Sequence, residues 1–166
     1  MPKQVRLPKT VLVDSGPLIA LFDRSDAYHE KILAFIRDTP YRFVTSLAVL
    51  TEVSHMLDFN VNTQIDFFEW VMSRGLDLEE ITQDDIPRII NLTKKYADLP
   101  MDFADATLVV AAEKTGIREI VSIDAQAARG GAVQSTSLSS RPEGTHSDFN
   151  VYRLPGKLLI RNIFPL

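Results

Sequence analysis

The sequence contains no cysteine, which excludes both a disulfide framework and a thiolate metal site. Its three histidines, His29, His55 and His146, are too scattered to indicate a zinc cluster. No apolar run approaches the roughly 20 residues that cross a bilayer, and the N-terminal stretch lacks the apolar core of a signal peptide. We therefore expect a cytoplasmic protein with no membrane segment.

Positive charge is also scarce. Lysine and arginine number 18 against 22 acidic residues, which gives a formal net charge of −4. This balance argues against a protein that holds nucleic acid by bulk electrostatics, although a cation bound among clustered carboxylates would reverse the field locally. The seven glycines form neither a phosphate-binding loop nor a dinucleotide fingerprint, and no nucleophile elbow is present.

Short apolar runs alternate with amphipathic segments along the chain. Its 166 residues, 45% of them hydrophobic, suggest one domain spanning residues 1–166 with a substantial core. The apolar runs predict strands at residues 11–13, 42–45, 76–81, 120–123 and 151–154. Helices are predicted at residues 29–38, after Ser46, and at 63–74, 84–95 and 100–116. This alternation indicates an α/β domain with a mostly parallel sheet.

Three helix boundaries are predicted from local signals. Gly75 is expected to end the helix at 63–74, as a C-terminal glycine does. Asp84 is expected to cap the helix at 84–95, in which Pro87 fits the first turn. Pro100 is expected to open the helix that ends near Gly116.

Residues 125–146 break the α/β pattern. The segment is rich in Ser, Gly, Ala and Thr and almost free of large apolar side chains. It cannot bury enough surface to fold independently, so we interpret it as a flexible insertion, with an ordered lid as the alternative.

Acidic residues lie where strands end and helices begin. Asp14 and Asp124 directly follow apolar runs, so both are expected at the carboxyl edge of the sheet, where α/β folds bind ligands. Asp105 lies near a helix start, with Asp102 three residues earlier on the same face. Glu52 lies in an otherwise apolar helix, where an unpaired charge would be costly. Oxygen ligands of this kind favour Mg²⁺ or Mn²⁺ over zinc.

Simpler interpretations exist for each acid. Asp14 and Asp124 could open turns, and Asp102 and Asp105 could complement a helix dipole. Glu52 could be solvated on a misjudged helix face. Glu52 and His55 also form the E-x-x-H spacing of di-iron bundles, but the second copy is missing and the chain is not an all-helical bundle.

Four stretches together resemble the PIN-domain ribonucleases, and most closely the VapC-like toxins of type II toxin–antitoxin modules. They are VLVDSGPLIALFDRSDAYHE, VTSLAVLTEVSHML, KYADLPMDFADATLVVAAEKTGIREIVSID and SDFNVYRL. The resemblance implies a three-layer α/β/α fold around a five-stranded parallel sheet, and cleavage of single-stranded RNA with Mg²⁺ or Mn²⁺. It also implies a homodimer and a small antitoxin partner.

The same resemblance assigns site residues. The acidic quartet that binds metal and catalyses cleavage in the family matches Asp14, Glu52, Asp105 and Asp124. Positions that are often acidic and assist match Asp102 and Asp148, and Ser15 matches a hydroxyl position that helps to hold the site. Scattered cations such as Arg24, Lys94 and Lys95 would then grip RNA.

The chain departs from the family pattern at one place. Family members run almost directly from the fourth acid into the D-F motif, whereas here residues 125–146 intervene between Asp124 and Ser147. The insertion could displace Asp124, cover the site, or loop into solvent. One alternative is therefore a catalytically silent module that binds an antitoxin or RNA. Another is a phosphoryl-transfer enzyme with Asp14 as nucleophile, although such enzymes carry a second Asp where this chain has Gly16.

Overall fold

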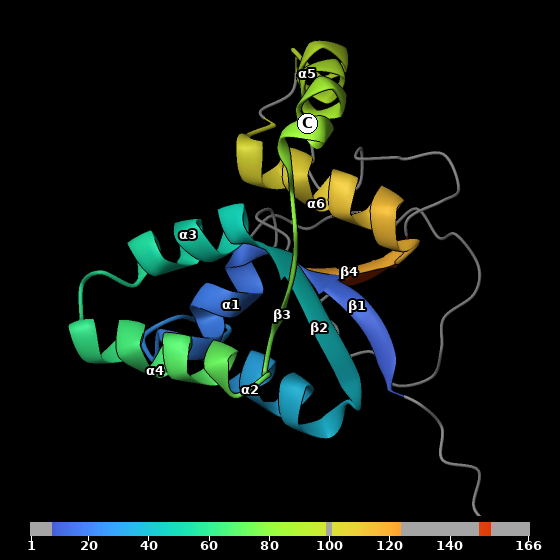
Figure 1. The fold of residues 1–166 in the computed structure, drawn as a ribbon. Helices are drawn as coiled ribbons and strands as arrows, with labels where there is room; N and C mark the ends of the chain where they lie inside the picture. The colour runs from blue at the N-terminus through green and yellow to red at the C-terminus, as the bar shows by residue number, and fades with distance from the viewer. Residues whose placement is uncertain (1–7, 99–100, 124–149, 154–166) are drawn as a thin grey trace, which may run out of the picture.

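Five strands form the sheet that organises the protein. The structure, a computed structural model, describes residues 8–98, 101–123 and 150–153 (Figure 1). The strands are β1 (Lys9–Val13), β2 (Tyr41–Ser46), β3 (Asp77–Glu79), β4 (Glu119–Ser122) and β5 (Asn150–Arg153). They lie in the order β3-β2-β1-β4-β5. All pairings are parallel except that of β4 with β5, so the predicted mostly parallel sheet of about five strands is confirmed.

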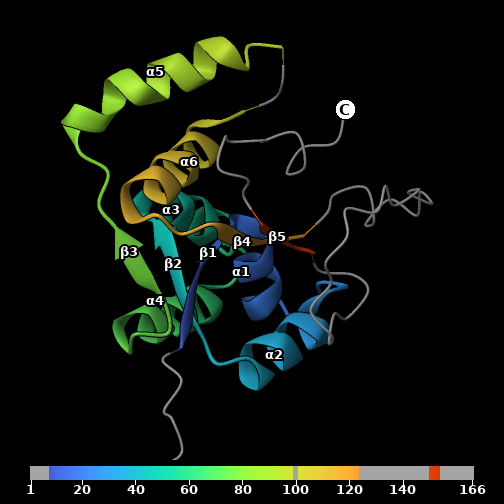
Figure 2. The same cartoon turned by 90° about the vertical axis from the view of Figure 1, so that its right-hand side faces the viewer.

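Helices flank this sheet. They are α1 (Ser15–Phe22), α2 (His29–Asp38), α3 (Leu47–Met56), α4 (Val61–Met72), α5 (Ile86–Lys95) and α6 (Phe103–Thr115), with a 3₁₀ turn η1 (Gln83–Asp85) before α5. Two views show α5 and α6 gathered at one side of the strands and α1, α2 and α4 at the other (Figures 1 and 2). Helix α3 contacts both α1 and α6. The helix predicted at 29–38 and the cap predicted at Ser46 are both confirmed.

The core forms around the central strand and the last helix. Val11, Leu12 and Val13 of β1 are fully buried because the strand has neighbours on both edges and helices over the sheet. Helix α6 is buried continuously from Ala106 to Ala112, as expected for a helix that is apolar on all sides. A second apolar cluster joins α5 to α6. The acidic first turn of α6 is therefore held on a rigid element.

The predicted helix end at Gly75 is wrong. Helix α4 ends at Met72, and Arg74 adopts the left-handed conformation with φ 64°. Gly75 serves a different purpose, because the Trp70 indole packs so closely over it that an added Cβ would overlap the ring. Its amide also donates to the Trp70 carbonyl at 3.0 Å. Glycine is therefore needed here for close approach rather than for a positive φ.

Two predicted helix starts are also corrected. Thr82 rather than Asp84 caps the turn before α5, through a reciprocal pair of hydrogen bonds with Asp85, while Pro87 occupies the first turn of α5 as predicted. Helix α6 begins at Phe103 with Asp102 as its N-cap, not at residue 100. Its end at Gly116, with φ 72°, is as predicted.

Some predictions fall on residues that the structure does not describe. The 125–146 insertion, Asp124 and Asp148 all lie outside the described residues. Within the described ranges, no helix is long and apolar enough to cross a membrane.

Candidate metal centre at the carboxyl edge of the sheet

Asp14 lies at the point in the sheet where the order of the strands changes direction. From β1 the chain proceeds outward to β2 and β3, and it later places β4 on the opposite side of β1. The carboxyl ends of β1 and β4 therefore flank a topological switch point, where open α/β sheets bind ligands. The amide of Asp14 donates to the Val121 carbonyl of β4 at 3.1 Å. This bond fixes the residue between the two strands.

Both carboxylate oxygens of Asp14 accept a hydrogen bond. The Ser15 amide donates to Oδ1 at 2.7 Å, which makes Asp14 the N-cap of α1, and the Ser122 hydroxyl donates to Oδ2 at 2.9 Å. Burial raises the pKa of Asp14 and outweighs these two hydrogen bonds, which lower it. The carboxylate is thus held in a fixed orientation in surroundings that disfavour its charge.

Ser122 is a site residue that the sequence analysis missed. It occupies the last position of β4 and is 4% exposed. A hydroxyl at the end of an otherwise apolar strand was the available signal, because a buried polar side chain requires a partner. The identity of that partner depends on the pairing of β1 with β4, which lies beyond local sequence patterns.

Glu52 lies on α3, half-buried, beside the buried Val53. Burial raises its pKa, and the charges of Asp102 and Asp14 raise it further, while a hydrogen bond with the Ser15 hydroxyl lowers it. Glu52 is therefore near the other acids, and the interpretation that it is solvated on a misjudged face is not supported. The Ser15 hydroxyl also lowers the pKa of Asp14. Ser15 therefore acts on the carboxylates of both Asp14 and Glu52.

Asp102 and Asp105 form a reciprocal cap at the start of α6. The Asp105 amide donates to Asp102 Oδ1 at 2.9 Å, and the Asp102 amide donates to Asp105 Oδ2 at 3.1 Å. Burial first, and then the charges of Asp102 and Asp14, raise the pKa of Asp105 to about 8, against the lowering effect of the Asp102 amide. Asp102 is therefore the N-cap of α6, outside the helix proper, rather than a first-turn acid that only complements the helix dipole, and the cap places both carboxylates in the same acidic group.

Three separate segments thus bring Asp14, Glu52, Asp102 and Asp105 within electrostatic reach of one another. Among residues 8–98 and 101–123, however, no three acidic or histidine side chains lie close enough to form a complete metal centre. The donor chemistry still fits a hard divalent cation, because all the oxygens are carboxylate oxygens and the raised pKa values report unrelieved burial and repulsion. Bound positive charge would relieve both.

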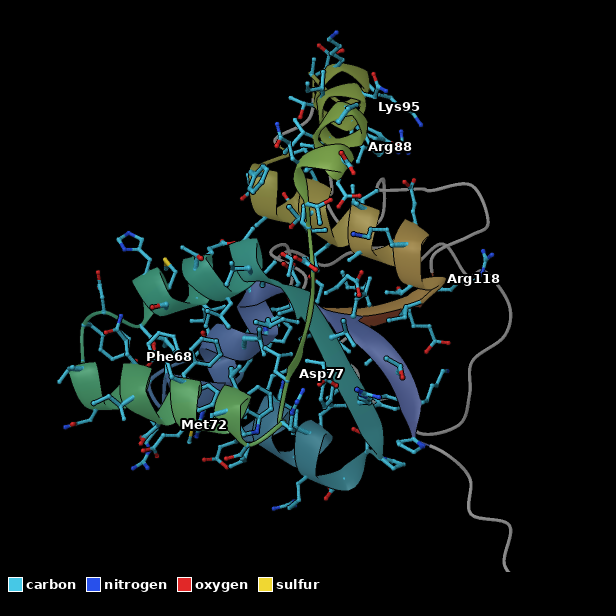
Figure 3. All side chains as sticks on the ribbon, in the orientation of Figure 1. Phe68, Met72, Asp77, Arg88, Lys95 and Arg118 are labelled. Carbon is cyan, nitrogen blue, oxygen red and sulfur yellow. The ribbon has the colours of Figure 1, made fainter. Side chains whose placement is uncertain are left out.

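The other predicted features lie away from this group. His55 is exposed and lies 3.3 Å from Asp58, so it does not accompany the half-buried Glu52. Figure 3 shows Lys95 on α5, which stands apart from the strands, and its ammonium lies 5.0 Å from the centre of the Tyr96 ring. Among the described residues, Arg24, Lys94 and Lys95 are not among the groups that shift the pKa of Asp14, Glu52 or Asp105.

Comparison with known proteins places this geometry in a family. A family model described as the PIN domain matches residues 11–132. The crystal structure of VapC20 of Mycobacterium tuberculosis, described as a sarcin–ricin loop cleaving toxin, shares the fold with a TM-score of 0.63 at 22% identity. That alignment covers 74% of this chain and 96% of VapC20, and no curated protein matches. Because the family model spans well over half of the sequence, including Asp14, Glu52 and Asp105, the chain belongs to the PIN domain family.

Proposed function

We propose that this protein is a metal-dependent endoribonuclease that hydrolyses RNA phosphodiester bonds and acts as the toxin of a toxin–antitoxin pair. One observation carries the proposal. Asp14 lies at the switch point of the sheet of a PIN domain, its charge raises the pKa values of Glu52 and Asp105 on two other elements, and its own pKa is raised by burial. Structural carboxylates normally have lowered or ordinary pKa values, whereas perturbed acids gathered at a ligand-binding edge are typical of functional sites.

The carboxylates would act as ligands rather than as nucleophiles. Asp14, Glu52, Asp105 and Asp124 would hold one or two Mg²⁺ or Mn²⁺ ions. When bound, such an ion lowers the pKa of water and stabilises negative charge on the reacting phosphate. The Ser15 amide and the Ser122 hydroxyl orient Asp14, and the Ser15 side chain also lowers the pKa of Glu52. Asp102 holds the Asp105 amide, and Asp148 would assist.

The substrate class can be tested directly. VapC20 is described as cleaving the sarcin–ricin loop, so we propose that a hairpin of that sequence be compared with an unstructured RNA of equal length. Either RNA would enter through the carboxyl edge of the sheet, because the acids lie there. The purified chain is expected to cut RNA with Mn²⁺ or Mg²⁺ and to stop when a chelator is added.

Asp14→Asn is the decisive variant. It keeps the size of the side chain and an oxygen for the Ser15 amide, but it removes the charge. We expect activity to fall by about 100-fold or more, because the charge on a metal ligand is lost. Asp66→Asn, an exposed acid on α4, is the matched control and should cut RNA as the unaltered chain does. Equal activity in Asp14→Asn, or undiminished cleavage in chelator, contradicts the proposal.

A catalytically silent module is the second candidate, favoured by the lack of a complete ligand group among the described residues. Titration with Mn²⁺ and with the proposed small antitoxin separates the two. Binding of the antitoxin without binding of Mn²⁺ would favour the silent module, and a short open reading frame directly upstream would support an antitoxin partner. The cytoplasmic location and the homodimer are further proposals, the second measurable as twice the chain mass in sedimentation.

A further inference from the structure

Buried hydroxyl groups gather near the acidic residues. Within the described residues, the buried polar side chains are Thr45, Ser46, Thr107 and Ser122. Ser122 donates to Asp14, and Thr45 donates to the carbonyl of Val13, the residue before Asp14, at 2.8 Å. Ser46 and Thr107 bond to each other at 2.7 Å across 61 residues of sequence. All of these hydroxyls therefore act at the carboxyl edge of the sheet.

The direction of the Ser46–Thr107 hydrogen bond follows from the neighbouring bonds. Thr107 donates its one hydroxyl proton to the Ala104 carbonyl at 2.6 Å, so it must accept from Ser46. The Ser46 oxygen in turn accepts from the Val49 amide at 3.2 Å. A continuous chain of hydrogen bonds therefore runs from the first turn of α3, through Ser46 and Thr107, to the first turn of α6.

These two turns belong to the helices that carry proposed ligands. Glu52 lies six residues after Ser46, which is about 9 Å along the axis of α3, and Asp105 lies two residues before Thr107, about 3 Å along α6. Both helices are packed into the core next to this bond, with Val49 and Val53 fully buried on α3 and Ala106 fully buried on α6. A shift at the Ser46–Thr107 bond would therefore be transmitted to the separation of Glu52 and Asp105.

We infer that Ser46 and Thr107 are a positioning pair, whose hydrogen bond sets the spacing between the helix that carries Glu52 and the helix that carries Asp105. The inference rests on the proposed function. It differs from a purely structural role, in which the two hydroxyls merely satisfy each other inside the core. A structural role predicts a loss of stability alone, whereas a positioning role predicts a change in the geometry of the site in protein that remains folded.

Thr107→Val tests the pair, since it keeps the shape of the side chain and removes the hydroxyl. In the full chain, calorimetric titration with Mn²⁺ alone should show affinity weakened by about tenfold, with a lower kcat on RNA at saturating Mn²⁺. Thr107→Ser keeps the hydroxyl and should restore both values. Thr115→Val is the matched control, because Thr115 makes a similar bond to the Ala111 carbonyl, at 2.7 Å, at the far end of the same helix.

Unaltered Mn²⁺ affinity in folded Thr107→Val would overturn the inference. Should that variant fail to fold, Ser46→Ala breaks the same bond from the other side, and the same weakening is expected. It also removes the N-cap of α3, so its melting point is compared with that of Thr115→Val.

A distance measurement keeps the inference testable without metal. The chain has no cysteine, so Met56→Cys on α3 and Phe103→Cys on α6, both at exposed positions, would carry the only two spin labels. Thr107→Val should broaden the distribution of distances between them. If the unaltered chain binds no Mn²⁺ but the distribution broadens, the proposed function fails while the positioning role stands. An unchanged distribution would overturn the pair whatever the metal does.

Discussion

At the scale of single residues, the acids of this site lower the free energy of unfolding of the metal-free protein when they are ionised. Asp14, Glu52 and Asp105 all have raised pKa values because of burial first and neighbouring negative charge second. Other carboxylates behave in the opposite way. Asp77 and Glu113 have pKa values lowered mainly by hydrogen bonds from Arg42 and Arg88. The hydrogen bonds that the site acids accept therefore do not offset their burial and the repulsion between them.

Asp105→Asn should stabilise the metal-free protein. The amide oxygen can still accept from the Asp102 amide, while the buried, repelled carboxyl is gone. A gain of about 1 kcal/mol is typical when functional strain is removed, and for a chain of this size it raises the melting midpoint by about 3 °C. Thermal unfolding in chelator measures the change. The variant should also lose the stabilisation that Mn²⁺ gives the unaltered chain. A lower midpoint in chelator would show that the carboxyl stabilises the fold.

Asp102→Asn separates the cap from the charge. Asparagine caps helices as well as aspartate does, so the melting midpoint should stay close to that of the unaltered chain, whereas Asp102→Ala should cost about 1 kcal/mol. Because the charge of Asp102 acts on Glu52 and Asp105, Mn²⁺ affinity should fall in Asp102→Asn. Wild-type affinity in this variant would leave Asp102 with the capping role alone.

At the scale of elements, two glycines are needed for different physical reasons. Gly116 ends α6 with φ 72° and has open space where a Cβ would lie, while Gly75 has the Trp70 ring there. The first position therefore depends on backbone conformation and the second on close packing.

These glycines give a paired prediction. Gly116→Ala should cost about 1 kcal/mol, the price of a left-handed non-glycine residue, and Gly116→Asn should cost less because asparagine tolerates that conformation. Gly75→Ala should cost about 2 kcal/mol, since the Trp70 ring must shift, and Gly75→Asn should recover nothing. Urea unfolding followed by tryptophan fluorescence measures all four variants. Recovery by asparagine at position 75 would contradict the packing explanation.

Most element identities were predictable from the sequence, whereas α1 was not predicted as a helix and several boundaries differ. The period of residues 29–38 and the Ser46 cap predicted α2 and the start of α3, because both signals are local. The predicted helix boundaries at Gly75 and Asp84 were wrong, although each residue type is common at helix ends. Arg74, in the left-handed conformation, follows the end of α4, and the Thr82–Asp85 pair caps the turn before α5. Within the site, Asp14 and Asp105 were placed by their positions at element ends. The hydrogen bonds of Ser122 and Thr107 require tertiary contacts that no local pattern contains.

At the scale of the whole molecule, two groups of acids have pKa values that are shifted in opposite directions. Acids outside the site such as Asp77, Asp85 and Glu113 have lowered pKa values and stabilise the fold above roughly pH 4. The site acids have raised pKa values, so the folded protein holds more protons than the unfolded chain as the pH rises toward 8. The change in stability between pH 5 and pH 8 therefore reports the ionisation of the site acids.

The metal-free protein should lose stability as the pH rises from about 5 to about 8. Asp105 has a folded pKa of about 8 against an ordinary value of 3.8. Its contribution is therefore fully present below the ordinary value and lost as the pH rises through the folded one. Mn²⁺ affinity should rise over the same range, because the cation and the proton compete for the carboxylates. Melting points measured in chelator and in Mn²⁺ at several pH values test both statements.

Asp105→Asn is the control for this profile, and its metal-free stability should vary less with pH. A flat metal-free profile for the unaltered chain between pH 5 and pH 8 would show that the raised pKa values are not present in solution.

The hydrogen bond between Ser122 and Asp14 can form only late in the synthesis of the chain. These residues are separated by 108 positions, and synthesis proceeds from the N-terminus at about 5 to 20 residues per second. A nascent chain therefore carries Asp14 for roughly 5 to 20 s before the strand that orients it has been made. The Asp14 carboxylate therefore gains its hydrogen bond from Ser122 only after synthesis has passed β4.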